Sequence, residues 1–282
     1  VAALADAEMR SLHAQLFAPD NMFVIGVGDI DPEGFVRQCE HAFGDMKKGN
    51  GRFIETSELP FSDGSRLVQV VDRPSAVQSS ILVGHVGIER GHEDFIPVYV
   101  MNMLLGGYFG SRLNLNLRED KGFTYGAHAR YDARRQAGPF VAGAEVRNEV
   151  TDLAIEEILG EMQRLREEEV SVEELENVKH YVVGSFPLQI ETPAQVAQRM
   201  VNIELYNLEK TYYNTFNSSV LALTAEDIRR VAQRWLHPDR AVIVAAGRAG
   251  VLRNTLERFG TVELFDAEGQ RIPNIESQAQ DI

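Results

Sequence analysis

Part of this sequence occurs twice, and the internal repeat constrains the fold more than any other feature. At a constant offset of 219 residues, Leu4–Gly28 aligns with Leu223–Gly247 without a gap. Each stretch is typical of a helix end, a Pro-Asp pair, an apolar strand and a glycine turn, and the strand "MFVIGVG" of the first matches "AVIVAAG" of the second. Self-similarity at a fixed spacing predicts that one structural unit is used more than once.

The two stretches share few identities but the same order of features. The identical pairs are Leu4 with Leu223, Arg10 with Arg229, Pro19 with Pro238, Asp20 with Asp239, and Gly28 with Gly247. The alternative explanation is that a common helix–Pro–strand pattern recurs by chance. If the repeat is real, the chain holds the tail of a first copy and all of a second, and roughly 150 residues of the first copy are absent.

The order of the expected elements indicates the α+β class. Apolar alternation predicts strands at 66–73, 77–88, 123–133, 139–146 and 241–246. Helical spacing predicts helices at 95–105, 112–118, 150–168, 172–186, 193–207, 225–235 and 251–259. Ser171 and Glu174 form a capping-box pattern at the start of one of them. Because most strands precede a group of helices, we expect a mostly antiparallel sheet with helices packed on one face, not an alternating α/β fold.

The repeat and the local composition divide the chain into four segments. They are the C-terminal remnant of a first repeat domain (1–45), a linker rich in Gly, Ser and charge (46–65), the complete second repeat domain (66–260) and a polar, frayed tail (261–282). Within the remnant we expect a helix, then the strand Met22–Val27, then a second helix that is capped by Asp31.

Net charge and cysteine usage restrict the possible partners. The 282 residues include 28 Lys and Arg against 42 Asp and Glu, a formal net charge of −14. Nucleic-acid binding needs clustered basic residues, so this class is excluded. No apolar run is long enough to cross a bilayer. Cys39 is the only cysteine, which excludes an intrachain disulfide. One cysteine is compatible with the cytoplasm or the periplasm, and we expect the bacterial periplasm.

The stretch Leu104–Tyr131 is the best candidate for chemistry. Gly106 and Gly107 allow the backbone to turn sharply and to approach a ligand. Arg118 falls at the end of a short predicted helix and Tyr125 at the start of the next strand, so both side chains are expected at one edge of the sheet. A guanidinium and a phenol hydroxyl together can hold a peptide carbonyl or stabilise an oxyanion.

A structural role would explain the same two residues. An arginine in the last turn of a helix complements the helix dipole, and a tyrosine is common in strands. The spacing alone leaves both interpretations of Arg118 and Tyr125 open.

No metal site is expected in this chain. The seven histidines are scattered, and none lies four residues from another on a predicted helix. His85 and His128 are expected on adjacent strands, but zinc needs three or four converging ligands.

Several motifs, in order along the chain, resemble the pitrilysin/insulinase family of inverzincin zinc peptidases, in the branch of mitochondrial processing peptidase and its bacterial relatives. "PDNMFVIGVGDIDPEGFVRQCEHAFGDM" is similar to the end of the first domain of that family. "LLGGYFGSRLNLNLREDKGFTYGAHARY", "VSVEELENVKHYVVGSFPLQIETPAQVAQRM" and "YYNTFNSSVLALTAEDIRRVAQRWLHPDRAVIVAAG" are similar to successive parts of the second. The resemblance covers nearly the whole chain, to about Gly260.

The resemblance implies two similar domains in tandem around a peptide-binding cavity, with this chain as the C-terminal half. The family motif H-x-x-E-H belongs to the first domain and is absent from this sequence. Zinc is therefore expected in the complete enzyme and not in this chain. By motif, Arg118 is the substrate-anchoring residue and Tyr125 the catalytic residue that stabilises the tetrahedral intermediate, with Gly106 and Gly107 beside the substrate.

Two functions agree with the resemblance. The chain is part of a zinc endopeptidase that pairs an unfolded peptide with a sheet edge and cleaves it, with the zinc in a missing N-terminal domain or a homologous subunit. Alternatively, it belongs to a non-catalytic homologue that binds a peptide or a partner as a helper subunit.

Overall fold

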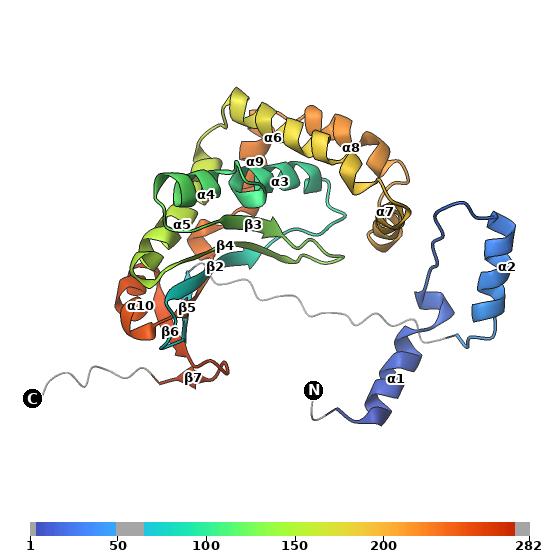
Figure 1. Cartoon of the computed structure of the whole chain (residues 1–282), viewed down its shortest axis with the longest axis horizontal. Helices are drawn as coiled ribbons and strands as arrows, with labels where there is room; N and C mark the ends of the chain where they lie inside the picture. The colour runs from blue at the N-terminus through green and yellow to red at the C-terminus, as the bar shows by residue number, and fades with distance from the viewer. Residues whose placement is uncertain (1–3, 49–64, 274–282) are drawn as a thin grey trace, which may run out of the picture. The chain divides into compact units, whose positions relative to one another are not determined.

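The structure is a computed structural model that describes residues 4–48 and 65–273. These residues fall into two compact units (Figure 1). Unit one comprises the described residues of Val1–Pro60 together with Pro187–Asn207, and unit two those of Phe61–Phe186 together with Leu208–Ile282. The predicted linker 46–65 lies almost entirely outside the described residues.

Unit two is built on a seven-stranded sheet whose strands come from distant parts of its sequence. In spatial order the strands are β3 (Ala127–Tyr131), β4 (Pro139–Arg147), β2 (Gln78–Val86), β5 (Val242–Gly247), β1 (Leu67–Asp72), β6 (Thr261–Phe265) and β7 (Arg271–Ile272). β1 pairs in parallel with β5 and β6, whereas the other neighbouring pairs are antiparallel. The predicted α+β class with a mostly antiparallel sheet is confirmed.

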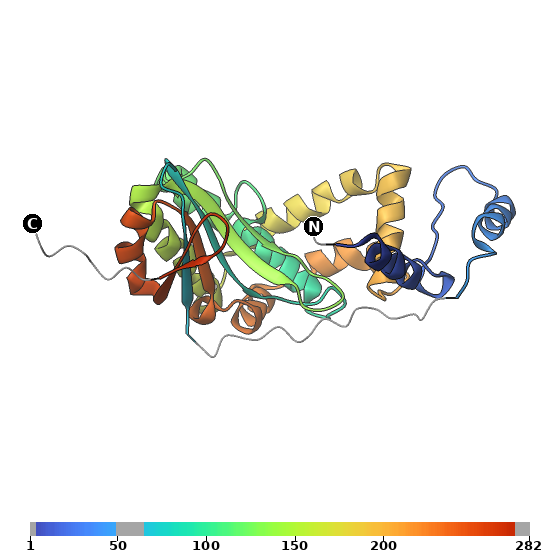
Figure 2. The same cartoon turned by 90° about the horizontal axis from the view of Figure 1, so that it is seen from below.

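Helices gather on one side of this sheet (Figures 1 and 2). The helices of unit two are α3 (Phe95–Asn102), α4 (Arg112–Asn114), α5 (Thr151–Glu167), α6 (Val172–Ser185), α8 (Tyr212–Leu221), α9 (Ala225–Trp235) and α10 (Ala249–Leu256). α5 packs on β2 and β4, α3 and α4 pack on β3, and α10 packs on β1. α8 was not among the predicted helices, because its polar residues interrupt the apolar period.

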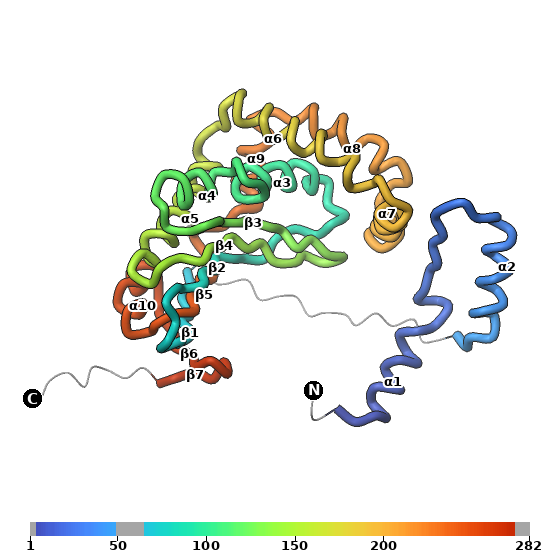
Figure 3. The backbone as a smooth tube through the Cα atoms, in the orientation of Figure 1, coloured from blue at the N-terminus to red at the C-terminus, as the bar shows by residue number. Residues whose placement is uncertain are grey.

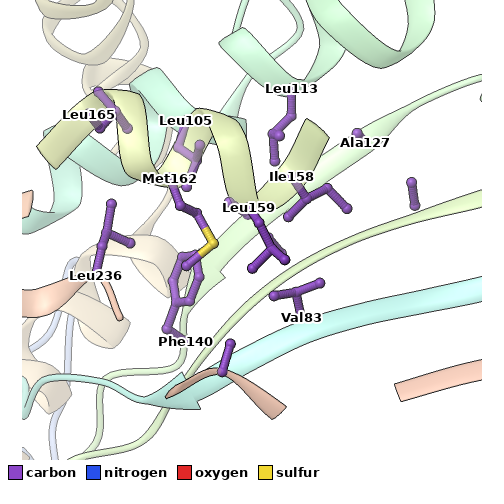
Figure 4. Close-up of a cluster of buried hydrophobic side chains, with 14 of the residues drawn as sticks. Val83, Leu105, Leu113, Ala127, Phe140, Ile158, Leu159, Met162, Leu165 and Leu236 are labelled. Atoms are coloured by element: carbon purple, nitrogen blue, oxygen red, sulfur yellow. The ribbon is translucent and has the colours of Figure 1, made fainter. Parts of the chain in front are cut away.

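The core lies between the sheet and α5, as Figure 4 shows for part of it. Val83 of β2 and Phe140 of β4 are fully buried, and so are Ile158 and Met162 of α5. Burial of a side chain of this size contributes about 1.5–3 kcal/mol to the stability of the fold. This packing holds α5 firmly on the sheet, which matters because α5 also anchors the candidate site.

The start of α6 confirms half of its predicted capping box. The Ser171 hydroxyl accepts a hydrogen bond from the Glu174 N–H at 3.1 Å. The Glu174 carboxylate does not return to the N-cap backbone. It binds Arg112 instead, which donates from Nε at 2.6 Å and from Nη2 at 2.9 Å. The bidentate pair gives Glu174 two charge-assisted hydrogen bonds to a guanidinium, in place of the single bond to a backbone N–H that a capping box would supply.

Unit one contains the helices α1 (Asp6–Leu16), α2 (Pro32–Phe43) and α7 (Pro193–Leu205), which are visible as tubes in Figure 3. Asp31 caps α2 as predicted, since its carboxylate accepts from the backbone N–H groups of Glu33 and Gly34. α7 buries no side chain among the described residues. The sequence analysis assigned it to the second repeat domain, and that boundary stays a prediction.

The predicted strand Met22–Val27 is wrong for the described chain. Met22 has extended backbone angles, φ −131° and ψ 147°, but the segment pairs with no strand among residues 4–48 and 65–273. Its counterpart in the repeat, β5, is flanked by β1 and β2. A strand is stabilised by ladder hydrogen bonds and cross-strand packing, and this segment has neither.

The helices that precede Met22–Val27 and β5 differ in the same way, because only one of them is buried. Ile228 and Val231 of α9 are fully buried, whereas their counterparts Met9 and Leu12 of α1 are 59% and 47% exposed. Within the described residues, only the second of the two similar stretches therefore has its apolar helix face covered.

The predicted tail 261–282 is wrong at its beginning. Thr261–Phe265 forms β6, and Arg271–Ile272 pairs with it as β7. "TVELF" alternates polar and apolar residues, and Val262 and Leu264 are buried. The polar residues that follow Phe265 made this short strand pattern hard to recognise in the sequence. Residues 274–282 lie outside the described part. Within that part, no helix is both long enough and apolar enough to span a membrane.

Candidate functional site

A π-helical turn extends α3 and brings the glycines of the site against β3. The turn covers Met103–Gly107. A Cβ atom on Gly106 would lie 2.4 Å from the backbone nitrogen of Ala129, so only glycine fits there. Gly106 is buried and Gly107 is exposed. Packing on β3 thus explains Gly106 without a ligand, and the predicted substrate contact of Gly107 stays a prediction.

Arg118 lies on a second π-helical turn, Leu115–Asp120, which continues α4. Gly122 follows with φ +61°, a left-handed conformation that glycine adopts without strain. The turn is closed by the Phe123 N–H, which donates to the Leu117 carbonyl at 2.8 Å. The predicted helix and its end at Gly122 are confirmed, and the backbone from Arg118 toward Tyr125 is hydrogen-bonded rather than loose.

Asn116 ties this turn to α5. Its amide donates to Glu157 Oε2 at 2.8 Å and to Glu161 Oε1 at 3.0 Å. Lys121 Nζ lies 3.0 Å from Glu157 Oε1. Burial acts to raise the pKa of Glu157, but the hydrogen bonds from Asn116 and Lys121 prevail and lower that pKa. These contacts fix the backbone that carries Arg118 on the helix that the core holds in place.

The Arg118 side chain rests on an exposed aromatic ring. Its guanidinium carbon lies 4.2 Å from the centroid of Phe109, and Nε lies 3.6 Å from Glu119 Oε1. The side chain of Arg118 is 33% exposed, and Phe109 is 67% exposed. Stacking orients the guanidinium plane and leaves donors of the guanidinium directed at solvent or a ligand.

Tyr125 is presented to solvent almost completely, with 93% of its surface exposed. It precedes β3, in a turn that Thr124 stabilises by hydrogen bonds with the N–H and the carbonyl of Gly126. No hydrogen bond of the Tyr125 hydroxyl occurs among the described residues. β3 begins at Ala127 and not at Phe123 as predicted. The backbone geometry brings the Arg118 and Tyr125 segments together, and the convergence of their side chains stays a prediction.

Two contacts with α6 support the glycine-rich loop from the other side. Arg112 and Glu174 form the bidentate pair described above, and Tyr108 packs on Tyr181 with ring centroids 4.9 Å apart. Burial, and then the nearby Glu174 carboxylate, raise the pKa of the Tyr108 hydroxyl. Tyr108 therefore stays protonated at neutral pH and serves as packing.

The described residues do not fit a zinc ion. No group of three or more His, Cys, Asp or Glu side chains that could hold a metal occurs in residues 4–48 and 65–273. The expectation that His85 and His128 lie on adjacent strands is wrong, because β4 runs between β2 and β3. His85 instead lies near His237, with ring centroids 5.1 Å apart.

A family model for the "Peptidase M16 inactive domain" matches residues 4–182. The chain belongs to the peptidase M16 inactive-domain family. The match includes the segment of Arg118 and Tyr125 and extends through most of α6, so the predicted resemblance to the pitrilysin/insulinase zinc peptidases is confirmed.

Relatives of this M16 domain are named as zinc proteases. The "Uncharacterized zinc protease YmxG" of Bacillus subtilis is 26% identical over 237 residues, which cover 83% of this chain and 56% of YmxG. The "Probable inactive metalloprotease YmfF" of the same organism is 22% identical over 76% of this chain and 49% of its own length. The chain thus spans about half the length of the curated relatives it matches.

Solved structures agree with the family. The peptidase M16 inactive domain from Pseudomonas fluorescens superposes with a TM-score of 0.79 at 25% identity, over 87% of this chain and 58% of that one. A protease from Helicobacter pylori superposes with a TM-score of 0.78 at 19% identity, over 87% of this chain and 60% of its own. The second likeness supports the fold alone.

Sequence reasoning missed the residues that support the site. Asn114 and Asn116 lie within or at the ends of helical turns, and Phe109 supports Arg118. Asparagine is a poor helix former because its amide competes for backbone hydrogen bonds. Two asparagines so close to a glycine-rich turn were therefore a signal that their amides bind groups outside their own helical turn.

Proposed function

We propose that this M16 domain binds an unfolded peptide and contributes Arg118 and Tyr125 to its cleavage by a zinc peptidase. The observation that carries the proposal is the exposure of these two side chains on a hydrogen-bonded backbone, in a chain that belongs to the family. A tyrosine that is 93% exposed buries little of its ring, so packing does not account for it. Its hydroxyl faces water and can donate to a substrate carbonyl instead.

Arg118 anchors the substrate. Its guanidinium presents several N–H donors in a fixed planar arrangement and lies 4.2 Å from the centroid of the Phe109 ring. The Glu119 carboxylate lies 3.6 Å from Arg118 Nε, which is too far for a hydrogen bond. A peptide carbonyl or a carboxylate of a substrate can accept from these donors at a shorter distance. Arg118 acts through binding, so its loss weakens the affinity for the peptide.

Tyr125 acts on the reacting carbonyl. The phenol hydroxyl donates a hydrogen bond to the oxygen on which negative charge develops as the carbonyl becomes tetrahedral. A donor that is placed for the charged oxygen stabilises the transition state more than the substrate. Loss of the hydroxyl therefore affects turnover more than binding.

The zinc of the complete enzyme belongs to another domain or to a homologous partner subunit. The donor set of the described residues does not fit a metal. The contribution of this chain is consequently restricted to substrate contacts.

Strand addition at β3 does not take part. β3 is an edge strand, but Asn114 bonds both the N–H and the carbonyl of Ala127, and Asn102 donates to the Ala129 carbonyl. A peptide that paired with this edge would have to displace both amides. Strand pairing of the peptide therefore needs another sheet edge, and at β3 the peptide is held by side chains.

A non-catalytic helper is the second candidate function. The family description contains the words "inactive domain", and one relative is named a probable inactive metalloprotease. A helper would bind peptide through Arg118 without any role for the Tyr125 hydroxyl in turnover.

Peptide binding by the purified chain tests the proposal. The probe is a fluorescently labelled, unstructured peptide followed by anisotropy. Arg118→Ala should weaken binding about tenfold, because a hydrogen bond to a charged group contributes about 1.5–3 kcal/mol. Arg258→Ala is the matched control: Arg258 also stacks on a phenylalanine, Phe259, at 4.7 Å, but it lies outside Leu104–Tyr131. Equal binding by wild type and Arg118→Ala would refute the proposal.

Turnover distinguishes the two candidates. In the complete enzyme, Tyr125→Phe should lower kcat about 100-fold and change KM little, as expected for removal of one oxyanion donor. Unchanged turnover would remove Tyr125 from the reaction and favour the helper.

A further inference from the structure

We propose that Asn114 is a positioning residue that fixes the distance between Arg118 and Tyr125. The inference rests on the proposed function, because it concerns how the two substrate-contacting side chains are held. Asn114 itself is 7% exposed and is not expected to touch the peptide.

The side-chain amide of Asn114 is fully used in hydrogen bonds. Nδ2 donates to the carbonyl of Ala127 at 2.9 Å, to Ser111 Oγ at 3.1 Å and to the carbonyl of Tyr108 at 3.2 Å. Oδ1 accepts from the N–H of Ala127 at 2.9 Å. The three segments that carry the candidate site, namely the glycine-rich loop, α4 and the start of β3, therefore meet at one amide.

Asn114 takes the place of a neighbouring strand on Ala127. A peptide group on an adjacent strand would offer β3 one carbonyl and one N–H, and the Asn114 amide offers the same pair. Only an amide side chain supplies both a donor and an acceptor at this point. An aspartate loses the donors, and a leucine of similar size loses every bond.

The position of Asn114 in the sequence couples it to both functional residues. Arg118 follows it by four residues, on the π-helical turn that continues α4. Ala127, which it binds, follows Tyr125 by two residues. The bond from Phe123 to Leu117 closes the same turn from the other end. A change at Asn114 therefore releases the Tyr108 carbonyl, next to Phe109 on which Arg118 rests, and the start of β3, which follows Tyr125. Arg118 and Tyr125 then lose their fixed relative placement, even if the fold survives.

Asn102 offers a matched comparison within the same unit. It is 8% exposed and donates to the carbonyl of Ala129, also on β3, at 3.0 Å. Its Oδ1 has no hydrogen-bond partner, and it does not bond to the Arg118 turn. Loss of Asn102 thus removes a buried asparagine bond to β3 without releasing the connection between Arg118 and Tyr125.

A double-mutant cycle on the full chain tests this role, again with the labelled unstructured peptide. Arg118→Ala should weaken binding about tenfold in wild type and about tenfold in Asn102→Leu. In Asn114→Leu, which already binds poorly, Arg118→Ala should weaken binding less than about twofold, because the guanidinium is no longer held in place. A merely structural role would leave the effect of Arg118→Ala equal in the two asparagine backgrounds.

Each result has a defined meaning. An effect of Arg118→Ala that is the same in Asn114→Leu and Asn102→Leu would overturn the inference and leave the proposed function intact. A wild-type chain whose binding does not depend on Arg118 would overturn the proposed function first. If Asn114→Leu does not fold, Asn114→Asp gives the same test, because it keeps the acceptor for the Ala127 N–H and loses the donors.

Discussion

Asp94 joins the start of α3 to the end of α9 through one buried carboxylate. It is 3% exposed and accepts hydrogen bonds from Arg230 at 2.7 Å, Arg234 at 2.9 Å and the Trp235 indole at 3.0 Å. Burial acts to raise the pKa of Asp94, but the bonds from Trp235 and Arg230 prevail and lower that pKa. The carboxylate is thus ionised and compensated at neutral pH.

Replacement of this carboxylate should destabilise unit two. Asp94→Asn keeps the shape but leaves the two guanidinium groups facing a neutral amide, and we expect a loss of about 2–4 kcal/mol in the free energy of unfolding. Urea titration followed by circular dichroism measures the difference. Asp132→Asn, which breaks a solvent-exposed pair with Arg134, should cost less than about 1 kcal/mol. A similar loss in the free energy of unfolding in both variants would show that the buried ion pairs of Asp94 stabilise the fold no more than an exposed pair does.

At the scale of elements, the end of β2 meets the turn before β5 at a pair of neutral histidines. His85 Nε2 accepts from the N–H of His237 at 3.2 Å, and His85 Nδ1 lies 2.8 Å from the Val86 carbonyl. His237 Nε2 lies 2.9 Å from Arg240. Burial lowers the pKa of His85 to about 4, and burial together with Arg240 lowers the pKa of His237 to about 4.

These two histidines should make the fold sensitive to acid. The unfolded chain takes up protons on both near pH 6.5, whereas the folded protein does so only near pH 4. Stability is therefore unaffected above pH 6.5 and falls as the pH decreases from 6.5 to about 4. After allowance for partial exposure, we expect the pair to account for a loss of about 2–4 kcal/mol between pH 7.5 and 4.5.

Urea unfolding across this range measures the effect. His237→Gln should remove roughly half of the loss assigned to the pair, because one titrating ring remains. His180→Gln, at an exposed position of α6, should leave the pH dependence as in wild type. A His237→Gln profile that matches wild type would exclude the histidine pair as its source.

Elements were predictable where their causes are local. The caps Asp31 and Ser171 and the apolar periods located α2 and α6 correctly, because these signals act within a few residues. Met22–Val27 has the sequence of β5 without its partners, and Thr261–Phe265 has partners that its polar surroundings concealed. Strands depend on distant chain, so the sequence alone could not decide them.

The residues of the candidate site also differ in whether local sequence could predict them. Arg118 and Tyr125 were predicted by motif and stay predictions, and the turn between them follows from Gly122. The residues that hold the turn were not predicted, because Asn114 and Asn116 bind β3 and α5, 13 and 41 residues further along the sequence. A buried amide reveals its role only once its distant partner is known.

At the scale of the whole molecule, the two copies of the repeat differ in how their apolar surface is used. Unit two covers the apolar face of α9 with its own helices α3 and α5. Unit one repeats the pattern of α9 in α1 with the equivalent side chains exposed among the described residues. This difference agrees with the proposal that the function needs a further domain or subunit, since exposed apolar patches commonly mark interaction surfaces.

Zinc binding by this chain alone provides a test at the same scale. A zinc site needs three or four free ligands. Cys39 is the only cysteine, and the closest approach of two histidine rings in the described chain is the His85–His237 pair. His85 binds backbone through both ring nitrogens, and His237 Nε2 faces Arg240. His85 cannot turn to a metal without breaking these bonds.

The purified chain should therefore contain no stoichiometric zinc after dialysis, as measured by mass spectrometry of the metal content. Added zinc should also leave the unfolding transition unchanged, because a ligand present at 100 times its Kd would raise the free energy of unfolding by about 2.7 kcal/mol. One equivalent of retained zinc, lost in His237→Gln, would place a metal site at the histidine pair. The ligands of the zinc would then lie in this chain, and the proposal that another domain or subunit supplies the metal would be wrong.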